Sequence, residues 1–373
     1  MKPLLLENVV LIDGTGRLPY KASIRIDGSR FAAISTASEK PGSEEFDVVD
    51  LAGFIALPGL IDCHVHLVSP VEPLVHEPYW KLNTPPTLKA FCAARNALDT
   101  LKAGFTTVRN CGGVSYGLPE DIFLRRAIEA GYLAGPRILA CGGGISMTGG
   151  HGDRQFPAFM PATPLLGYGD ETCDDPASCR REVRRKVKMG ADFIKAYTSG
   201  GVSTPGDGPQ SAEFTPEEIL AIVEEAHAHE KRVAVHAYGL QGIRNAVAAG
   251  VDTVEHGCYL DEALAEHMAN SGTSLVTTLG ILKAILRRGK TYPNPEALKK
   301  AEIVVAAQSR AFRIARSAGI NMAMGTDASV SIRNGDNALE LVELTGEGLS
   351  PFDALLMATR NAAVALGLQD EIG

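Results

Sequence analysis

From Pro58 to the end of the chain, short apolar runs alternate with longer stretches that mix apolar and polar positions. Apolar runs of about four to eight residues between turn residues are typical of buried strands, and the longer stretches have helical periodicity. Repeated units of this kind indicate a parallel sheet covered by helices. The strands are expected at residues 60–67, 105–111, 137–142, 193–198, 232–239, 252–258, 274–280 and 321–328.

Glycine stands shortly before four of these strands, in LKAG-FTTVRN, VKMGAD-FIKAY, AAGVD-TVEHG and SAGI-NMAMGTD. A glycine there can end the preceding helix in the left-handed conformation. The helix in TPEEILAIVEEAHAHEK should begin at Thr215, with Pro216 in the first helical position and Glu218 completing a capping box. Eight such units predict an α/β fold, a closed (β/α)8 TIM barrel rather than an open doubly wound sheet, with catalytic groups at the C-terminal ends of the strands.

The first 57 residues have a different pattern, with short strands in ENVVLIDGTG, ASIRIDGSRFAAIS and FDVVDLAGFIALPG that are separated by Gly and Asp. We therefore expect a small β domain at residues 1–57 and the barrel at residues 58–364. A chain of 373 residues is long enough for this arrangement.

Composition narrows the class of protein. With 45% hydrophobic and 21% charged residues the chain should form a compact globule. The net charge of -8 and the scattered Lys and Arg residues exclude a nucleic-acid partner. No apolar run approaches the roughly 20 residues of a membrane span, and Glu7 and Asn8 interrupt the apolar N-terminus before a signal peptide could form. We expect a cytoplasmic protein, in which the seven cysteines are reduced and mostly buried.

Ligand-type side chains cluster at the ends of the expected strands. His64 and His66 alternate on the first strand, so both point to the same face and could hold one metal, although a pair of ordinary core histidines has the same pattern. His236 and His256 each end an apolar strand just before a glycine-containing loop, and Asp327 ends the last strand. At these ends all five side chains can reach the barrel mouth.

Lys195 stands inside the apolar strand FIKAYT without a nearby acid in sequence. A buried, unpaired ammonium group is costly, which leaves a distant carboxylate partner, a plain structural lysine, or a modified lysine. Desolvation favours the neutral amine, and a neutral amine can take up carbon dioxide as a carbamate when metals stabilise the anion.

The motifs PGLIDCHVHL, FIKAYTSGG, VAVHAYG, TVEHG and MGTDA, in this order, resemble the metal-binding strand motifs of the amidohydrolase superfamily. The closest resemblance is to the binuclear branch of Xaa-Pro dipeptidases (prolidases) and related carboxyl-terminal dipeptidases. It implies two divalent metal ions, with zinc as the first expectation and cobalt or manganese compatible with the same ligands. His64, His66 and Asp327 would hold the more buried metal, His236 and His256 the second, and a carboxylated Lys195 would bridge them.

The resemblance also implies a mechanism and a substrate. A metal-bridging hydroxide would attack the amide carbonyl, and Asp327 would take its proton and return it to the leaving nitrogen. His151 in GGHGD and Tyr238 in HAYG would contact the substrate, although His151 could equally be a solvated loop residue. The small-molecule substrate would be an Xaa-Pro or similar dipeptide, or an N-acyl amino acid, and a homo-oligomer is compatible with this interpretation.

Relatives usually continue past a segment like LGLQDEIG into strands that complete the small β-sandwich domain. We therefore expect the C-terminal part of that domain, about residues 365–373, to be incomplete. The alternative functions are a cyclic-amide hydrolase resembling imidazolonepropionase, or a deaminase, on the same barrel. A one-metal enzyme has no need for Lys195. A non-catalytic assembly protein would keep the barrel without its ligands.

Overall fold

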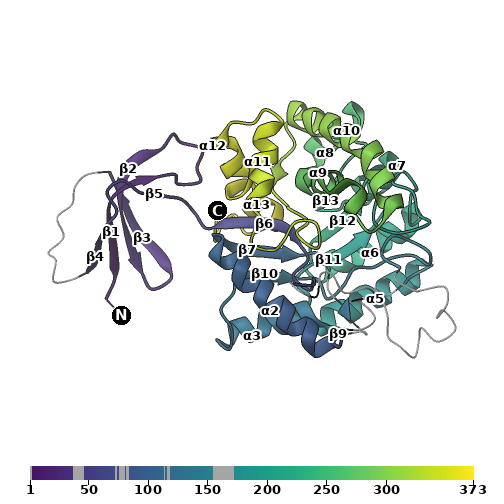
Figure 1. Ribbon diagram of the computed structural model, residues 1–373, viewed down its shortest axis with the longest axis horizontal. Coiled ribbons are helices and arrows are strands. Elements are labelled where there is room, and N and C mark those ends of the chain that lie inside the picture. Colours follow the sequence, from purple (N-terminus) through teal and green to yellow (C-terminus); the bar gives the residue numbers. More distant parts are fainter. Residues whose placement is uncertain are drawn as a thin grey trace.

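The computed structural model describes residues 2–36, 46–71, 74, 80, 84–112, 114–115, 118–153 and 172–373. Parallel strands from Leu60 onward lie at the centre of the larger part of the molecule (Figure 1). Each of the eight expected strands is present, and each is shorter than expected. They are β6 (Leu60–Val65), β7 (Phe105–Asn110), β10 (Arg137–Ala140), β11 (Ile194–Tyr197), β12 (Val233–Ala237), β13 (Thr253–His256), β14 (Ser274–Val276) and β15 (Met322–Ala323).

Hydrogen bonds join these strands into two parallel sheets, in the orders β10-β7-β6 and β11-β12-β13-β14-β15. Two isolated parallel bridges connect the edges of the sheets. Val65 of β6 pairs with Ala328, which follows β15, and Ile145, which follows β10, pairs with Ala196 of β11. The strands therefore follow one another around a ring in chain order, which confirms the expected TIM-barrel fold.

Helices pack around the strands and cover their outer faces (Figure 1). They are α2 (Pro86–Lys102), α3 (Glu120–Glu129), α5 (Pro176–Met189), α6 (Pro216–Ala228), α7 (Leu240–Ala249), α8 (Glu262–Ser271), α9 (Leu279–Arg288), α10 (Pro295–Ala318), α11 (Leu339–Gly346), α12 (Pro351–Met357) and α13 (Arg360–Leu366). Helix α6 begins as expected, because Thr215 and Glu218 form a reciprocal capping box and Pro216 is the first helical residue.

The glycines that precede four of the strands have the expected conformation. Gly104, Gly190, Gly250 and Gly319 have φ angles of 93°, 99°, 87° and 75°. A residue with a Cβ atom is rarely stable there, so glycine lets the chain leave each helix and enter the next strand within a few residues.

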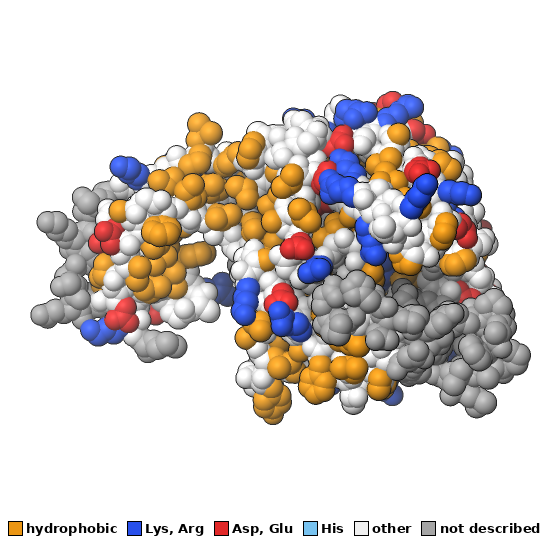
Figure 2. All heavy atoms as spheres, in the orientation of Figure 1, with side chains coloured by type: hydrophobic (Ala, Val, Ile, Leu, Met, Phe, Trp, Pro, Cys, Tyr) orange, Lys and Arg blue, Asp and Glu red, His pale blue; other side chains and the backbone are white. Residues whose placement is uncertain are grey.

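The N-terminal unit stands apart from the barrel (Figure 1). Its sheet has the order β3-β2-β1-β4, with β5 paired to β1. A small core of Val9, Leu11, Ala22 and Ile24 holds it together. Apolar side chains lie open on its surface (Figure 2). The strands are β1 (Leu4–Leu11), β2 (Tyr20–Asp27), β3 (Arg30–Ser35), β4 (Asp47–Asp50) and β5 (Ile55–Ala56).

The last residues of the chain lie on the barrel. After α13, residues 367–373 form turns, and Leu368 and Ile372 pack against a cluster that includes Ile61 and Ala323 at the N-terminal ends of β6 and β15. Arg360 donates a hydrogen bond of 3.0 Å to the Thr15 carbonyl and so joins the barrel to the N-terminal unit.

All seven cysteines are buried and free, as the sequence predicts for reduced thiols. Within the described part of the chain, we find no helix with the length and apolarity needed to cross a membrane.

Candidate metal centre

Three of the expected ligands meet where β6 and β15 end. His66 Nε2 lies 3.0 Å and His64 Nε2 lies 3.9 Å from Asp327 Oδ1. One ligand atom from each side chain lies within 4.8 Å of the others, a spacing that one metal ion could span. His64 and His66 lie side by side because side chains alternate along a strand, so residues two apart point to the same face.

A buried hydrogen-bond network fixes β6 against the segment that carries Asp327. The Asp62 carboxylate accepts hydrogen bonds from Thr326 Oγ1 (2.6 Å) and Asn337 Nδ2 (2.7 Å). The Asp327 amide donates to the His64 carbonyl over 2.8 Å. Asp327 itself has a φ of 55°, in the left-handed region, so the chain turns away immediately after the ligand.

The remaining ligands form a second group that adjoins the first. The His236 and His256 ring centres are 4.7 Å apart, and the His64 and His256 ring centres are 5.0 Å apart. His256 Nδ1 lies 2.6 Å from Thr278 Oγ1, which holds the ring in place. The structure thus brings the histidines of strands β6, β12 and β13 to one end of the barrel.

Lys195 on β11 belongs to the same cluster. Its Nζ atom is buried and makes no hydrogen bond to any residue that the structure describes, and the Tyr197 ring centre is 5.8 Å away. Burial lowers the pKa of His64, His236 and His256, and the charge of Lys195 lowers each of these pKa values further. Lys195 therefore lies close enough to act on all three histidines.

These side chains fit a pair of divalent metal ions. For His256, burial and the Lys195 charge lower the pKa to about 3, so its imidazole is neutral, as a metal ligand must be. Burial alone would raise the pKa of Asp327, but the hydrogen bond from His66 and the charges of His64 and His66 hold it below its usual value. The partnerless amine of Lys195 is the group that a metal-stabilised carbamate would satisfy.

The expected substrate contacts border the second group. The His151 ring is stacked on the His236 ring at 4.3 Å, and the Tyr238 ring centre lies 4.8 Å from both His236 and His256. His151 follows the glycine-rich segment after β10. A Cβ atom on Gly152 would lie 2.3 Å from the Tyr197 ring, so this glycine allows the segment to approach the centre closely.

Two carboxylates that the sequence interpretation missed hold His151. Its Nδ1 atom lies 2.6 Å from Asp207 Oδ2, and Lys300 Nζ binds the other Asp207 oxygen at 3.0 Å. The His151 amide donates to Glu213 Oε1 over 2.7 Å, whereas Glu213 Oε2 is buried without a partner among the described residues. His151 is therefore a fixed residue and not a solvated one.

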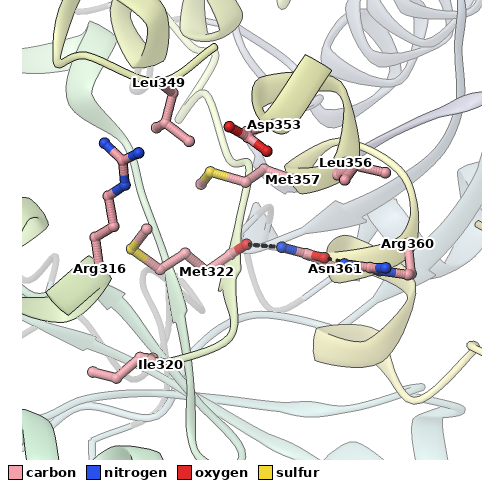
Figure 3. Close-up of a pocket in the computed structure, with 9 residues that line it drawn as sticks. All are labelled: Arg316, Ile320, Met322, Leu349, Asp353, Leu356, Met357, Arg360 and Asn361. Carbon is pink, nitrogen blue, oxygen red and sulfur yellow. Dashed lines mark hydrogen bonds between the residues drawn. The ribbon is translucent and has the colours of Figure 1, made fainter. Parts of the chain in front are cut away.

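Two cavities lie elsewhere, at the N-terminal ends of the strands. One, of about 260 Å³, is bordered by Met322, Arg316 and Asp353 (Figure 3). The other, of about 530 Å³, includes Arg137 and Arg232. None of the six expected ligands lines either cavity. In TIM barrels the C-terminal ends of the strands carry function, so we place the site at the histidine cluster.

Comparison with known proteins identifies the family of the chain. The model of the Amidohydrolase family matches residues 55–373, which include all six expected ligands. The chain therefore belongs to the Amidohydrolase family, whose members are hydrolases that usually bind divalent metals.

Individual relatives differ in substrate. The chain is 33% identical to a Xaa-Pro dipeptidase solved with methionine bound in its active site, with a TM-score of 0.89 over 100% of this chain and 90% of that one. It is 32% identical to ochratoxinase of Aspergillus niger over 84% of this chain and 66% of the relative, slightly less than two thirds of that protein. Imidazolonepropionase of Brucella suis is 26% identical over 95% of this chain and 84% of the relative.

The buried Glu213 carboxylate, whose Oε2 atom has no partner among the described residues, should make stability depend on pH. Burial, with the nearby Asp207 charge, raises the pKa of Glu213 from 4.5 to about 7. The folded state then holds a proton that the unfolded chain releases near pH 4.5. The bound proton contributes at most about 3 kcal/mol to the free energy of unfolding. This stabilisation is fully present below about pH 4.5 and is lost as the pH rises to about 7.

Glu213→Gln should remove this loss, so the variant should gain stability relative to the wild type between about pH 5 and about pH 8. Urea unfolding of both proteins at the two pH values measures the difference. If the variant and the wild type differed in stability by the same amount at both pH values, the raised pKa of Glu213 would be contradicted.

Proposed function

We propose that this protein is a binuclear metal-dependent dipeptidase that cleaves Xaa-Pro or similar dipeptides, or closely related N-acyl amino acids. The observation that supports two metals is the buried Lys195 amine, which has no hydrogen-bond partner in the described structure although it adjoins three histidines. The similarity to a Xaa-Pro dipeptidase over the whole chain supports the substrate class.

In this proposal His64, His66 and Asp327 hold the more buried metal, and His236 and His256 hold the second. Lys195, as a carbamate, would complete the donor set. Zinc suits these nitrogen and oxygen ligands, and cobalt or manganese would also fit. When bound, such ions supply Lewis acidity and lower the pKa of a coordinated water.

The residues of the chain then position the substrate and move the proton. Asp327 Oδ1 lies 3.0 Å from His66 Nε2 at the junction of the two groups, where its carboxylate can accept a proton from the attacking water. The same oxygen can return that proton to the leaving nitrogen. The neighbouring histidines that lower the pKa of Asp327 keep it ionised and ready to accept.

His151 and Tyr238 face the second group and are the proposed substrate contacts. Asp207 fixes the His151 Nδ1 atom, which leaves Nε2 to contact the carbonyl or the terminal carboxylate of the substrate. Tyr238 is buried, and burial raises the pKa of its hydroxyl well above the usual value, so it stays a hydrogen-bond donor. Two fixed polar groups beside the metals suit a small substrate with a free carboxylate close to the scissile amide.

The bridging role of Lys195 can be tested by metal content. Lys195→Ala should lose one or both metals and most activity, and short carboxylic acids such as acetate should restore part of the activity by replacing the carbamate oxygens. Lys186→Ala is the matched control, because Lys186 is equally buried but bonded to the Gly142 carbonyl at 2.8 Å, far from the histidines. Elemental analysis that gives one metal or none in active wild-type protein would refute the proposal.

The substrate class is tested with Xaa-Pro dipeptides whose C-terminus is free or blocked as an amide. Blocking should lower kcat/KM at least about tenfold. Tyr238→Phe should reproduce part of the loss on the free acid and add little on the amide, because the contact is already missing there. Tyr132→Phe, at an exposed tyrosine, is the control. Equal cleavage of both forms, or reaction of cyclic amides alone, would favour an imidazolonepropionase-like function instead.

Gly201→Ala tests the position of His151 without removing it. The new Cβ atom would lie 2.3 Å from His151 Cε1, so the ring must move although Asp207 binds its Nδ1 atom. We expect kcat/KM to fall at least about tenfold with both metals retained. Gly346→Ala, where a Cβ atom meets nothing within 4 Å, should behave like the wild type. Wild-type kinetics in Gly201→Ala would exclude His151 from the substrate site.

A further inference from the structure

A buried ion pair lies behind the first metal ligand. Glu255 of β13 is completely buried, and its Oε2 atom lies 2.8 Å from His64 Nδ1. Its other oxygen, Oε1, lies 2.5 Å from an Arg109 nitrogen of β7. Glu255 thus connects the arginine on one strand to the histidine on another, across the interior of the barrel.

Each of the three Arg109 nitrogens donates a hydrogen bond inside the barrel. Three of its five N–H donors have these partners: Nε–H donates to the Cys63 carbonyl (2.8 Å), and the two terminal nitrogens donate to Thr253 Oγ1 (3.0 Å) and to Glu255. Thr253 also donates to Glu255 Oε1 over 2.6 Å. A buried charge pair is stable only when its hydrogen bonds are made, and here each charged group is held in one orientation.

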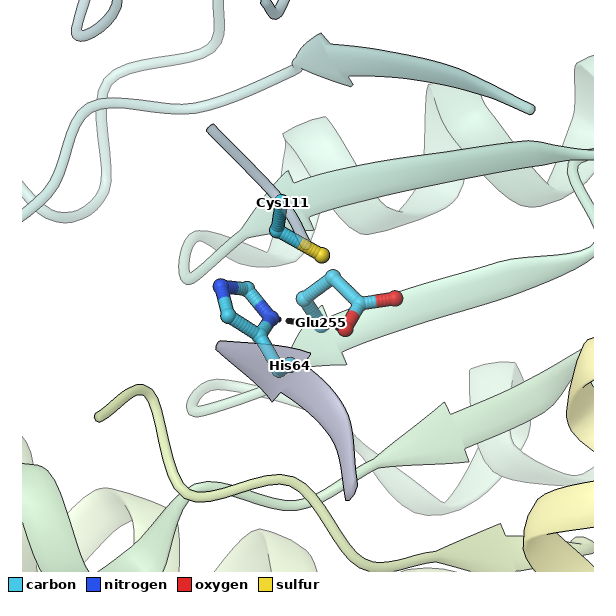
Figure 4. A group of neighbouring side chains, drawn as sticks. All are labelled: His64, Cys111 and Glu255. Atoms are coloured by element: carbon cyan, nitrogen blue, oxygen red, sulfur yellow. Dashed lines mark hydrogen bonds and ion pairs between the residues drawn. The ribbon is translucent and has the colours of Figure 1, made fainter. Parts of the chain in front are cut away.

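The same place offers a competing interpretation. His64, Cys111 and Glu255 point toward one another, so their ligand atoms could surround a metal (Figure 4). However, Arg109 and Thr253 already occupy one Glu255 oxygen, and the Cys111 thiol lies 3.8 Å from the Cys63 carbonyl. The arginine would stand directly beside a cation at this position, which is unfavourable.

We propose that Glu255 and Arg109 are positioning residues for the metal centre: Glu255 accepts the Nδ1–H of His64 and thereby directs Nε2 toward Asp327, and Arg109 fixes Glu255. Partners of this kind set the tautomer and orientation of a metal-binding histidine. The inference rests on the proposed metal centre but not on the proposed substrate.

The test separates metal affinity from folding. In Glu255→Leu the buried Arg109 loses its counterion, so folding suffers as well. The double variant Arg109→Met/Glu255→Leu removes both charges and should restore the stability of the metal-free protein to near that of the wild type. Its affinity for Zn²⁺, measured by competition with a chromophoric chelator, should remain about 10- to 100-fold weaker than that of the wild type.

The control is an arginine–glutamate pair outside the barrel. Arg184 donates two hydrogen bonds, of 2.7 and 2.9 Å, to Glu225 between helices α5 and α6. Arg184→Met/Glu225→Leu should leave Zn²⁺ affinity unchanged. Glu255→Gln, which keeps the side-chain shape, is the second variant and should also weaken Zn²⁺ binding, because a neutral amide oxygen is a weaker acceptor.

Wild-type Zn²⁺ affinity in the double variant or in Glu255→Gln would overturn the inference. Loss of one zinc equivalent in Cys111→Ala would overturn it as well, because the thiol would then be a ligand. Failure of the wild type to cleave dipeptides would count against the proposed substrate but would leave the Zn²⁺ titrations valid.

Discussion

The Lys195 amine has no hydrogen-bond partner in the described structure, and it lies where three buried histidines meet. This unfavourable contact is the constraint on which the site depends. Burial already opposes charge on His64, His236 and His256, and Lys195 opposes it further. No neutral apolar core would gather such groups, because each must find a polar partner or lose stability. In the proposed metal centre, anionic modification of the lysine and cations between the histidines would turn these repulsions into attractions.

Closed parallel strands make this concentration of ligands possible. Five of the eight strands contribute one or two of the proposed ligands, in the strand or just after it, and the ring brings these side chains together although the residues are far apart in sequence. The Asp62 network locks the first strand to the last, where the ring closes. The His64–Asp327 contact therefore depends on the closure of the barrel and not on local structure.

The sequence predicted those features that follow from local patterns. Apolar runs identified the strands, glycines such as Gly250 marked the helix ends, and alternation placed His64 and His66 on one face. The expected strands were too long, because the regular ladder ends before the apolar run does and only isolated backbone hydrogen bonds, such as the Val65–Ala328 bridge, continue toward the mouth. Neither Arg109 nor Glu255 was singled out, since their roles depend on which residues of distant strands β7, β13 and β6 face one another in the interior. Each looks in sequence like an ordinary charge in an apolar strand, although a buried arginine there needs a partner.

Two of the ligands are also the points where the chain changes direction. His256, the last residue of β13, and Asp327, which follows β15, have φ angles of 73° and 55°, so the backbone departs at once after each proposed ligand. A residue inserted before either position would displace the ligand, whereas one inserted after the turn would only lengthen a loop. Descendants of this chain can therefore exchange the loops that select a substrate while the lengths of β13 and β15 stay fixed. Relatives with different substrates within one family are the expected product of such a division.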